Sequence, residues 1–395
     1  IRWGSFQKNS ESIWFALNDE AYKNMYKSWS NEYLWHRYNV KLHAGENTLN
    51  FHYRKAYFRL DKIIVTNAIG YSPIGTGQEP KDLWTPIDYN TEQSMYGSIP
   101  LPSYIPPKSH PRVMVTADKI SAIRNNLNHP ENIEAYNMIL KYAQYSKEEC
   151  ELVPPQKGGN NYSVRGLGYM ASNAFLYLVE GDKECGRKAV EGTISFLETL
   201  DISSLSPMNA SRQGGYALYI SAEVYDWCYD LMTDEERHRI VEAGLKLMGN
   251  FEFSWLPSLT ELAYESGHAC ESEFLKCELA FGIAVYDEYP EIFNIVGGRI
   301  FNEYIPTKNF LYENGSFNQM GPNYSGFRFP FEMYMTYLLD NIGAKNLVSP
   351  KQRDYLTGSI LTRLPDGGQF KSGDSNYHVL EYTSDFKTAL FFASN

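Results

Sequence analysis

The stretch Thr233-Asp-Glu-Glu-Arg-His-Arg-Ile-Val-Glu-Ala-Gly-Leu-Lys-Leu-Met248 decides the fold of most of this chain. Thr233 and Glu236 have the spacing of a capping box, in which each residue satisfies a free backbone N–H of the first turn. The acidic residues of that turn also oppose the positive end of the helix dipole. The stretch therefore predicts a helix with a defined start.

Helical periodicity extends in both directions, from His110 to Arg363. Thr116 is a candidate N-cap for a first helix that carries Ile120, Ile123 and Leu127 on one face. Further helices are predicted over residues 166–180, 183–200, 214–231, 233–251, 272–286, 289–305, 326–342 and 350–363. No β-rich interval separates them, so the sequence predicts an array of helix pairs. A closed or incomplete (α/α) toroid and a solenoid remain alternatives.

The ends of the chain differ from this array. Residues 1–75 carry strand signals, with alternating apolar runs around the turn Gly45-Glu46-Asn47 and a β-branched run over residues 57–66. Residues 76–109 are rich in Pro, Gly and Ser, which predicts an extended surface linker. After the helical region 110–363, residues 364–395 are expected to open a C-terminal β domain that the chain does not complete. The predicted fold is multidomain α+β, with an N-terminal β-sandwich, an (α/α) toroid and the start of a C-terminal antiparallel β-sandwich.

Composition and charge limit the classes of binding partner. The formal net charge of −11 argues against nucleic acid or an anionic membrane surface as the partner. No apolar run is long enough to span a bilayer. Aromatic residues make up 15% of the chain, which favours stacking on sugar rings, with a tyrosine-rich core as the alternative. The five cysteines show no metal-ligand spacing, and most lie in apolar contexts typical of buried thiols.

Two short stretches carry the candidate chemistry. A glycine-rich turn, Gly315–Pro322, delivers Tyr324, and a second turn delivers His268 between the carboxylates Glu265 and Glu271. A histidine changes charge near neutral pH, and a phenol can act as base and then acid once cationic neighbours lower its pKa. Such a pair can remove the acidic proton beside a carboxylate and expel a glycosidic oxygen, which predicts β-elimination on a uronic acid.

Four stretches, in order, resemble the heparinase II/III-type polysaccharide lyases, especially the exolytic alginate and heparin lyase branch. They are His110–Thr116, Tyr225–Asp230, Ser266–His268 and Asn314–Tyr324. The resemblance covers roughly residues 110–376 and departs from the family at Gln319-Met320-Gly321, where the family often has a glutamate before the glycine. Separately, Arg59–Asn67 and Tyr71–Gly77 resemble the closing strand of jelly-roll carbohydrate-binding modules, so the sandwich either binds glycan or only packs on the catalytic domain.

The lyase resemblance implies two catalytic residues. Tyr324 would take the C5 proton, protonate the leaving O4, or do both in turn. His268 would neutralise the uronate carboxylate or act as the base on the opposite face, and Glu271 would orient His268, with Glu265 and Glu273 as alternatives.

The resemblance also implies a set of substrate-binding residues. Arg212 and Gln213 are expected in a turn before a helix, where a planar guanidinium can pair two oxygens of a carboxylate or sulfate. Arg165 and Arg328, the latter one turn beyond Tyr324, are further candidates of the same kind.

Further expectations follow from the family. The substrate would be an acidic polysaccharide, heparin-like or alginate-like, cleaved to a 4,5-unsaturated uronate. No cofactor is implied beyond a structural zinc or calcium ion in the C-terminal domain, and no metal ligands are assigned. The expected location is periplasmic or secreted; the chain opens at Ile1 without Met, which is typical of a processed or cut N-terminus.

Two other classes of function remain open. A glycoside hydrolase on a helical toroid would use a pair of carboxylates, for which Asp226, Asp230, Glu265 and Glu271 are available. A non-catalytic glycan-binding protein would use the aromatic residues without turnover.

Overall fold

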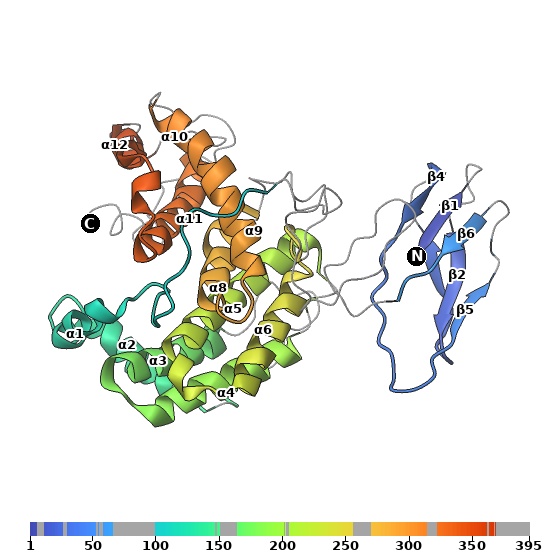
Figure 1. Ribbon diagram of the computed structural model, residues 1–395, viewed down its shortest axis with the longest axis horizontal. Helices are drawn as coiled ribbons and strands as arrows, with labels where there is room; N and C mark the ends of the chain where they lie inside the picture. The colour runs from blue at the N-terminus through green and yellow to red at the C-terminus, as the bar shows by residue number, and fades with distance from the viewer. Residues whose placement is uncertain are drawn as a thin grey trace. The chain divides into compact units, whose positions relative to one another are not determined.

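The structure is a computed structural model that describes residues 1–5, 12–26, 30–52, 54, 58–65, 99–146, 148–150, 164–200, 202, 205–255, 270–313, 322–361, 363–366 and 368. The chain divides into two compact units, Ile1–Asp82 and Leu83–Asn395. The first holds small antiparallel sheets and the second is helical, so the protein combines α and β structure (Figure 1).

The N-terminal unit contains two three-stranded antiparallel sheets. One has the order β4-β1-β6, with β4 (Ser30–Trp35), β1 (Arg2–Ser5) and β6 (Phe58–Lys62). The other has the order β3-β2-β5, with β3 (Lys23–Tyr26), β2 (Ser12–Leu17) and β5 (Leu49–His52).

Alternation along the strands builds the core of this unit. Phe15 and Leu17 of β2 and Met25 of β3 are buried together, and Phe51 of β5 packs against them. Trp14 is exposed, although Ser12 and Ala16 on the same face of β2 are buried.

Two strand predictions can be compared with the structure: the alternating runs around Gly45 and the β-branched run over residues 57–66. The later run contains β6, and the turn is present, with Gly45 at φ 94° and the Asn47 side chain accepting the His43 N–H at 3.0 Å. Residues 41–44, however, form no strand. β5, after the turn, pairs with β2, so the strand prediction is wrong for the residues before the turn.

The second unit is built from helices, which are α1 (Ala117–Asn126), α2 (Ile133–Ala143), α3 (Val164–Glu180), α4 (Lys183–Thr199), α5 (Pro207–Trp227), α6 (Asp234–Met248), α7 (Cys270–Ser272), α8 (Leu279–Ala284), α9 (Glu291–Arg299), α10 (Ile305–Glu313), α11 (Pro322–Asn341) and α12 (Asp354–Leu361). Two π-helical segments, η3 (Glu273–Glu278) and η4 (Ile300–Tyr304), join α7 to α8 and α9 to α10. In the part of the chain that the structure describes, no helix is both long and apolar enough to cross a membrane.

Most predicted helices are present. Thr116 precedes α1 as predicted, but its side chain makes no capping hydrogen bond. Thr233 and Glu236 form the predicted capping box: the Glu236 N–H donates to Thr233 Oγ1 at 3.2 Å, and the Thr233 N–H donates to Glu236 Oε2 at 2.9 Å. α2 is a helix for which no prediction was made. It has no fully buried residue, and it packs on α3, where Gly168 leaves room for the Tyr142 ring.

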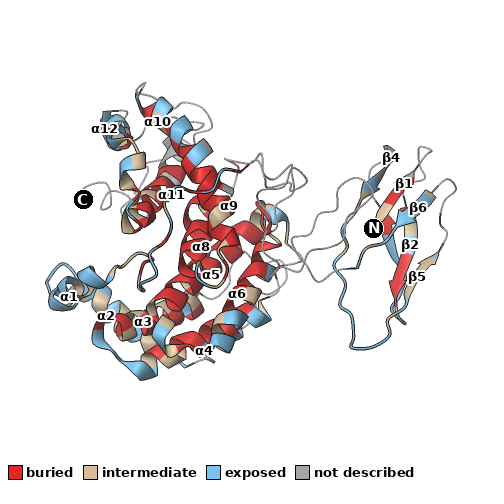
Figure 2. Cartoon of the chain, in the orientation of Figure 1, coloured by how far each residue is buried: buried red, intermediate tan, exposed pale blue. Residues whose placement is uncertain are grey.

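Four helices, α3, α5, α8 and α11, lie side by side and run in the same direction. α5 contacts α3 and α8, and η3 contacts both α5 and α11. Near the start of α5, Gly215 faces Cys277 of η3; at its end, Tyr225 donates a hydrogen bond to Glu288, just beyond α8. α11 follows the same direction, since Arg328 pairs with Glu271 and Tyr334 lies over Lys276. α5 and α8 are buried almost throughout (Figure 2), while α4 and α6 each keep an exposed face.

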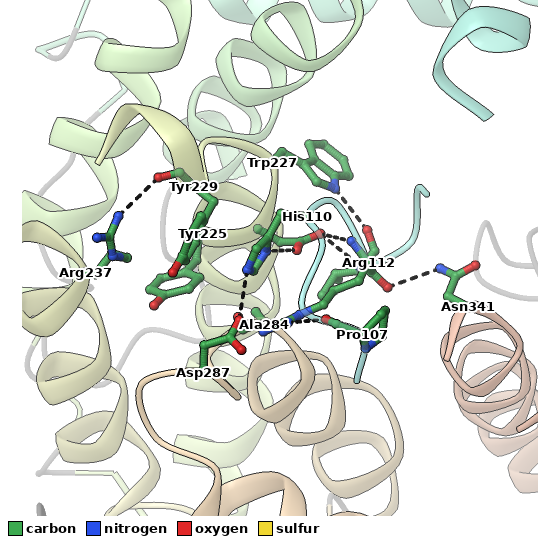
Figure 3. A network of polar contacts seen from close by, with 12 residues as sticks. Pro107, His110, Arg112, Tyr225, Trp227, Tyr229, Arg237, Ala284, Asp287 and Asn341 are labelled. Atoms are coloured by element: carbon green, nitrogen blue, oxygen red, sulfur yellow. Dashed lines mark hydrogen bonds and ion pairs between the residues drawn. The ribbon is translucent and has the colours of Figure 1, made fainter. Parts of the chain in front are cut away.

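The His110–Val113 segment closes the carboxyl ends of these helices (Figure 3). Asp226, at the end of α5, accepts the backbone N–H groups of Arg112 and Val113, both at 2.7 Å, and its Oδ1 is 2.6 Å from His110 Nδ1. Arg112 donates to the Ala284 carbonyl of α8 at 2.9 Å and pairs with Asp287 at 2.9 Å. We call this set, His110, Arg112, Val113, Asp226 and Asp287, the Asp226 network.

The network reaches the remaining two helices as well. Trp227 donates to the Val113 carbonyl at 3.0 Å and its ring meets Phe175 of α3, while Asn341, at the end of α11, reaches the Arg112 carbonyl at 3.5 Å. Two of the four stretches that resemble the lyase family therefore have a structural role here: they tie the carboxyl ends of α3, α5, α8 and α11 together.

The second part of the predicted linker is anchored to the helical unit. Ile99 is buried, and a Cβ on Gly298 of α9 would lie 2.4 Å from the Pro100 carbonyl oxygen, so only glycine lets the two backbones come this close. The Tyr104 ring meets the Phe301 ring edge-on at 6.2 Å. Residues 99–109 thus pack on helices, whereas residues 76–98 lie outside the described residues.

Candidate active site

The amino ends of the parallel helices carry most of the predicted site residues. Arg165 lies in the first turn of α3, Arg212 and Gln213 near the start of α5, Glu271 in α7, and Tyr324 in the first turn of α11. Because the Asp226 network gathers the carboxyl ends, these residues lie towards the opposite end of the helix layer. Helix amino ends carry partial positive charge, which favours an anion there.

Tyr324 and Arg328 are neighbours on one face of α11. The centre of the Arg328 guanidinium is 5.2 Å from the centre of the Tyr324 ring, as their separation by one helical turn allows. Tyr324 is half-buried and Arg328 is buried, so the guanidinium lies mostly out of water. A cation held over an aromatic ring at reduced solvation stabilises negative charge on that ring.

Arg328 is held by a buried carboxylate that is also on the predicted site list. Its Nε lies 3.5 Å from Glu271 Oε2, and Glu271 is 1% exposed. The other oxygen of Glu271 accepts a hydrogen bond from Tyr304 at 2.7 Å and lies 3.5 Å from Lys308 Nζ. The structure thus places Glu271 in a set of charged groups with Arg328.

A second buried carboxylate completes this set. Glu332 Oε1 is 2.8 Å from Lys308 Nζ and 3.0 Å from the Tyr304 hydroxyl, and its other oxygen accepts from Tyr312. Burial, the largest cause, raises the pKa of Glu332 to about 7, and the neighbouring Lys308 charge opposes that rise. We call Glu271, Tyr304, Lys308, Tyr312, Arg328 and Glu332 the Glu271 cluster.

Both π-helical segments border the Glu271 cluster. η3 begins directly after Ser272, and η4 ends at Tyr304, whose hydroxyl bridges the two carboxylates. A π-helical turn inserts an extra residue and re-aims the side chains that follow, and such turns are frequent at functional sites.

The other predicted site residues are placed differently. His268 lies outside the described residues. The sequence analysis places Arg212 and Gln213 in a turn, which is wrong: both lie within α5, which starts at Pro207. Arg212 is exposed and Gln213 is buried. Proline favours the first helical turn, and Gly214 serves close packing against Phe251 instead of forming a turn. Arg165 is exposed, with its guanidinium 5.7 Å from the Tyr145 ring centre.

The sequence-based list omits the remaining members of the Glu271 cluster. Tyr304, Lys308 and Tyr312 recur at intervals of four, as do Tyr324, Arg328 and Glu332. Two such polar rows within otherwise apolar helices are a signal that could have revealed them, because residues four apart share a helix face.

A separate buried carboxyl, that of Glu223, lies on α5 beside Lys276. Lys276 Nζ is 3.8 Å from the Tyr334 ring centre and 4.5 Å from that of Tyr219. Burial raises the pKa of the neighbouring Glu223 to about 7, against a hydrogen bond from Tyr219 and the charge of Lys276. These residues line the contact between α5, η3 and α11.

Two of the four carboxylates considered for a hydrolase, Asp226 and Glu271, have structural or ionic partners. Asp226 is 1% exposed, and its oxygens accept two backbone N–H groups and face His110. Glu271 is balanced by buried cations, and Glu265 lies outside the described residues. Asp230 is exposed. Among the residues that the structure describes, no group of three or more His, Cys, Asp or Glu side chains could hold a metal ion.

Comparison with known proteins finds no match: no protein-family model fits the chain, and no curated protein is similar to it. The arrangement of side chains and the short motifs therefore carry the functional argument alone.

Proposed function

We propose that the protein is a polysaccharide lyase that cleaves a uronic-acid-containing glycan, heparin-like or alginate-like, by β-elimination. The observation that carries this proposal is the pairing of Tyr324 with Arg328, which is itself held by Glu271. A phenol can act as a base near neutral pH only if positive charge stabilises its phenolate, and Arg328 supplies that charge.

In the proposed reaction a base removes the proton from C5 of the uronate. The electron pair left at C5 forms the C4–C5 double bond, the C4–O4 bond breaks, and O4 leaves with a proton from an acid. We assign Tyr324 to one or both proton transfers and His268 to the uronate carboxylate or to the opposite face. The transient negative charge on the carboxylate needs cationic or hydrogen-bonding neighbours, and Arg212, Gln213 and Arg165 are the proposed candidates at the helix amino ends.

The proposal includes the finer architecture and setting of the protein. The helical unit would be an (α/α) toroid with its cleft at the amino ends of α3, α5, α7 and α11. The two N-terminal sheets would form a glycan-binding sandwich, and the protein would act in the periplasm or outside the cell. The hydrolase alternative is less well supported, since Asp226 and Glu271 have structural and ionic partners.

The test is ultraviolet absorbance of the protein mixed with each of a panel of uronic-acid polysaccharides. The proposal expects growing absorbance from the conjugated double bond with at least one polymer. New reducing ends without that absorbance would replace the lyase with a hydrolase. Binding without either signal would leave a glycan-binding protein.

A further inference from the structure

Glu332 is a buried ionisable group to which the proposed reaction gives no role. It lies two turns after Tyr324 and one turn after Arg328 on α11, so the three side chains follow one face of the helix. Its side chain is fully buried, and a buried carboxyl is costly to keep unless it is paired.

One lysine connects the two buried carboxylates. Lys308 Nζ is 2.8 Å from Glu332 Oε1 and 3.5 Å from Glu271 Oε1, and the Tyr304 hydroxyl lies within hydrogen-bond distance of both carboxylates. Glu271 in turn faces Arg328, whose guanidinium lies over Tyr324. Charges thus alternate from Glu332 through Lys308 and Glu271 to Arg328, next to the proposed catalytic ring.

We propose that Glu332 is a positioning residue for Tyr324, and that its charge, acting through Lys308, Glu271 and Arg328, sets how much positive charge faces the Tyr324 ring. The catalytic meaning of this inference rests on the proposed function, but the electrostatic coupling itself does not.

The direction of the coupling follows from the charges. With Glu332 ionised, the two carboxylates balance Lys308 and Arg328. With Glu332 protonated, Lys308 pairs with Glu271, so Arg328 is less neutralised and the cluster carries one net positive charge. Because the cluster is buried, this charge acts through a lower effective dielectric than water and favours the Tyr324 phenolate.

The titration falls in a useful range and involves several neighbours. Burial raises the pKa of Glu332 to about 7, so its charge changes around neutral pH. The titratable and charged groups that face it are Glu271 of α7, Tyr304 of η4, Lys308 and Tyr312 of α10, Tyr355 of α12 and, through Glu271, Arg328 of its own helix.

The first test follows Tyr324 itself by nuclear magnetic resonance with isotope-labelled tyrosine. The Tyr324 signal is identified by its loss in Tyr324→Phe. In the wild-type protein we expect it to shift with a midpoint near the Glu332 pKa of about 7, and in Glu332→Gln we expect that shift to be absent. The matched control is Glu223→Gln, which removes another buried carboxyl with a pKa of about 7 but leaves Glu332 in place, so the shift should remain.

A second readout is the pH profile of turnover. The wild-type kcat should fall with rising pH as Glu332 ionises. This falling limb of the profile should be absent in Glu332→Gln and present in Glu223→Gln. If Glu332→Gln does not fold, Glu332→Asp keeps the charge and should retain the limb with a displaced midpoint.

The outcomes separate the two proposals. A Tyr324 signal that shifts equally in Glu332→Gln, or that does not shift in the wild type, would overturn this inference and leave the lyase proposal standing. Absence of turnover with every polysaccharide would overturn the lyase proposal, while the resonance measurement would still decide the coupling.

Discussion

Arg328 contacts both the proposed catalytic Tyr324 and the buried Glu271. Its guanidinium lies over the half-buried Tyr324 ring on one side and faces the buried Glu271 on the other. A planar guanidinium can stack and pair at once, which a lysine ammonium cannot do in the same geometry. The phenol of Tyr324 therefore has a fixed cation beside it, and this is the feature that the proposed elimination needs.

At the residue scale, Tyr324→Phe should abolish turnover while the fold is unchanged, because only the hydroxyl is removed. Circular dichroism and thermal unfolding check the fold, and the ultraviolet assay checks turnover. His268→Ala should lower kcat by at least about a hundredfold, the usual scale for a general acid or base. Near-wild-type rates in either variant would remove that residue from the proposed mechanism.

At the scale of elements, the carboxyl ends of four helices depend on one short segment. Asp226 of α5 holds the Arg112 and Val113 backbone, and Arg112 in turn holds α8 through the Ala284 carbonyl. The candidate site residues lie at the opposite, amino ends of the same helices. The segment is one of the stretches that resemble the lyase family, and its contacts here join α5 to α8.

The Asp226 network gives a stability prediction. Asp226→Ala removes the oxygen that accepts the Arg112 and Val113 N–H groups, and it removes the charge facing His110. The loss of buried, charge-assisted hydrogen bonds should lower the free energy of unfolding by about 2–4 kcal/mol, measured in urea. Asp230→Ala, at an exposed position four residues later, is the control and should leave the urea midpoint unchanged.

Close helix packing gives a second prediction at this scale. A Cβ on Gly244 of α6 would lie 2.3 Å from the Phe281 ring of α8, so Gly244→Ala should destabilise the protein by about 1–3 kcal/mol through overpacking. Gly358→Ala in α12 meets nothing within 4 Å and should stabilise by up to about 1 kcal/mol, because alanine favours the helix. Equal thermal shifts in the two variants would contradict this difference.

At the scale of the whole molecule, two buried carboxyls should make stability depend on pH. Burial raises the pKa values of Glu223 and Glu332 from about 4.5 to about 7. Between these values the folded protein binds more protons than the unfolded chain, so the free energy of unfolding should fall as pH rises through this window.

Urea unfolding at a series of pH values measures this slope. Glu223→Gln and Glu332→Gln should each flatten it, because an amide does not titrate. A pH slope that is as steep in the variants as in the wild type would mean that other groups control the stability in this window.

The sequence by itself determined where most helices lie along the chain. Caps, proline and apolar spacing act over a few residues, so the Thr233 capping box and the Tyr324–Arg328 spacing could be read directly. Only the tertiary structure decided that Asp226 is a structural anchor and that Lys308 joins Glu271 to Glu332. These depend on contacts between helices far apart in the chain, which local propensity does not encode.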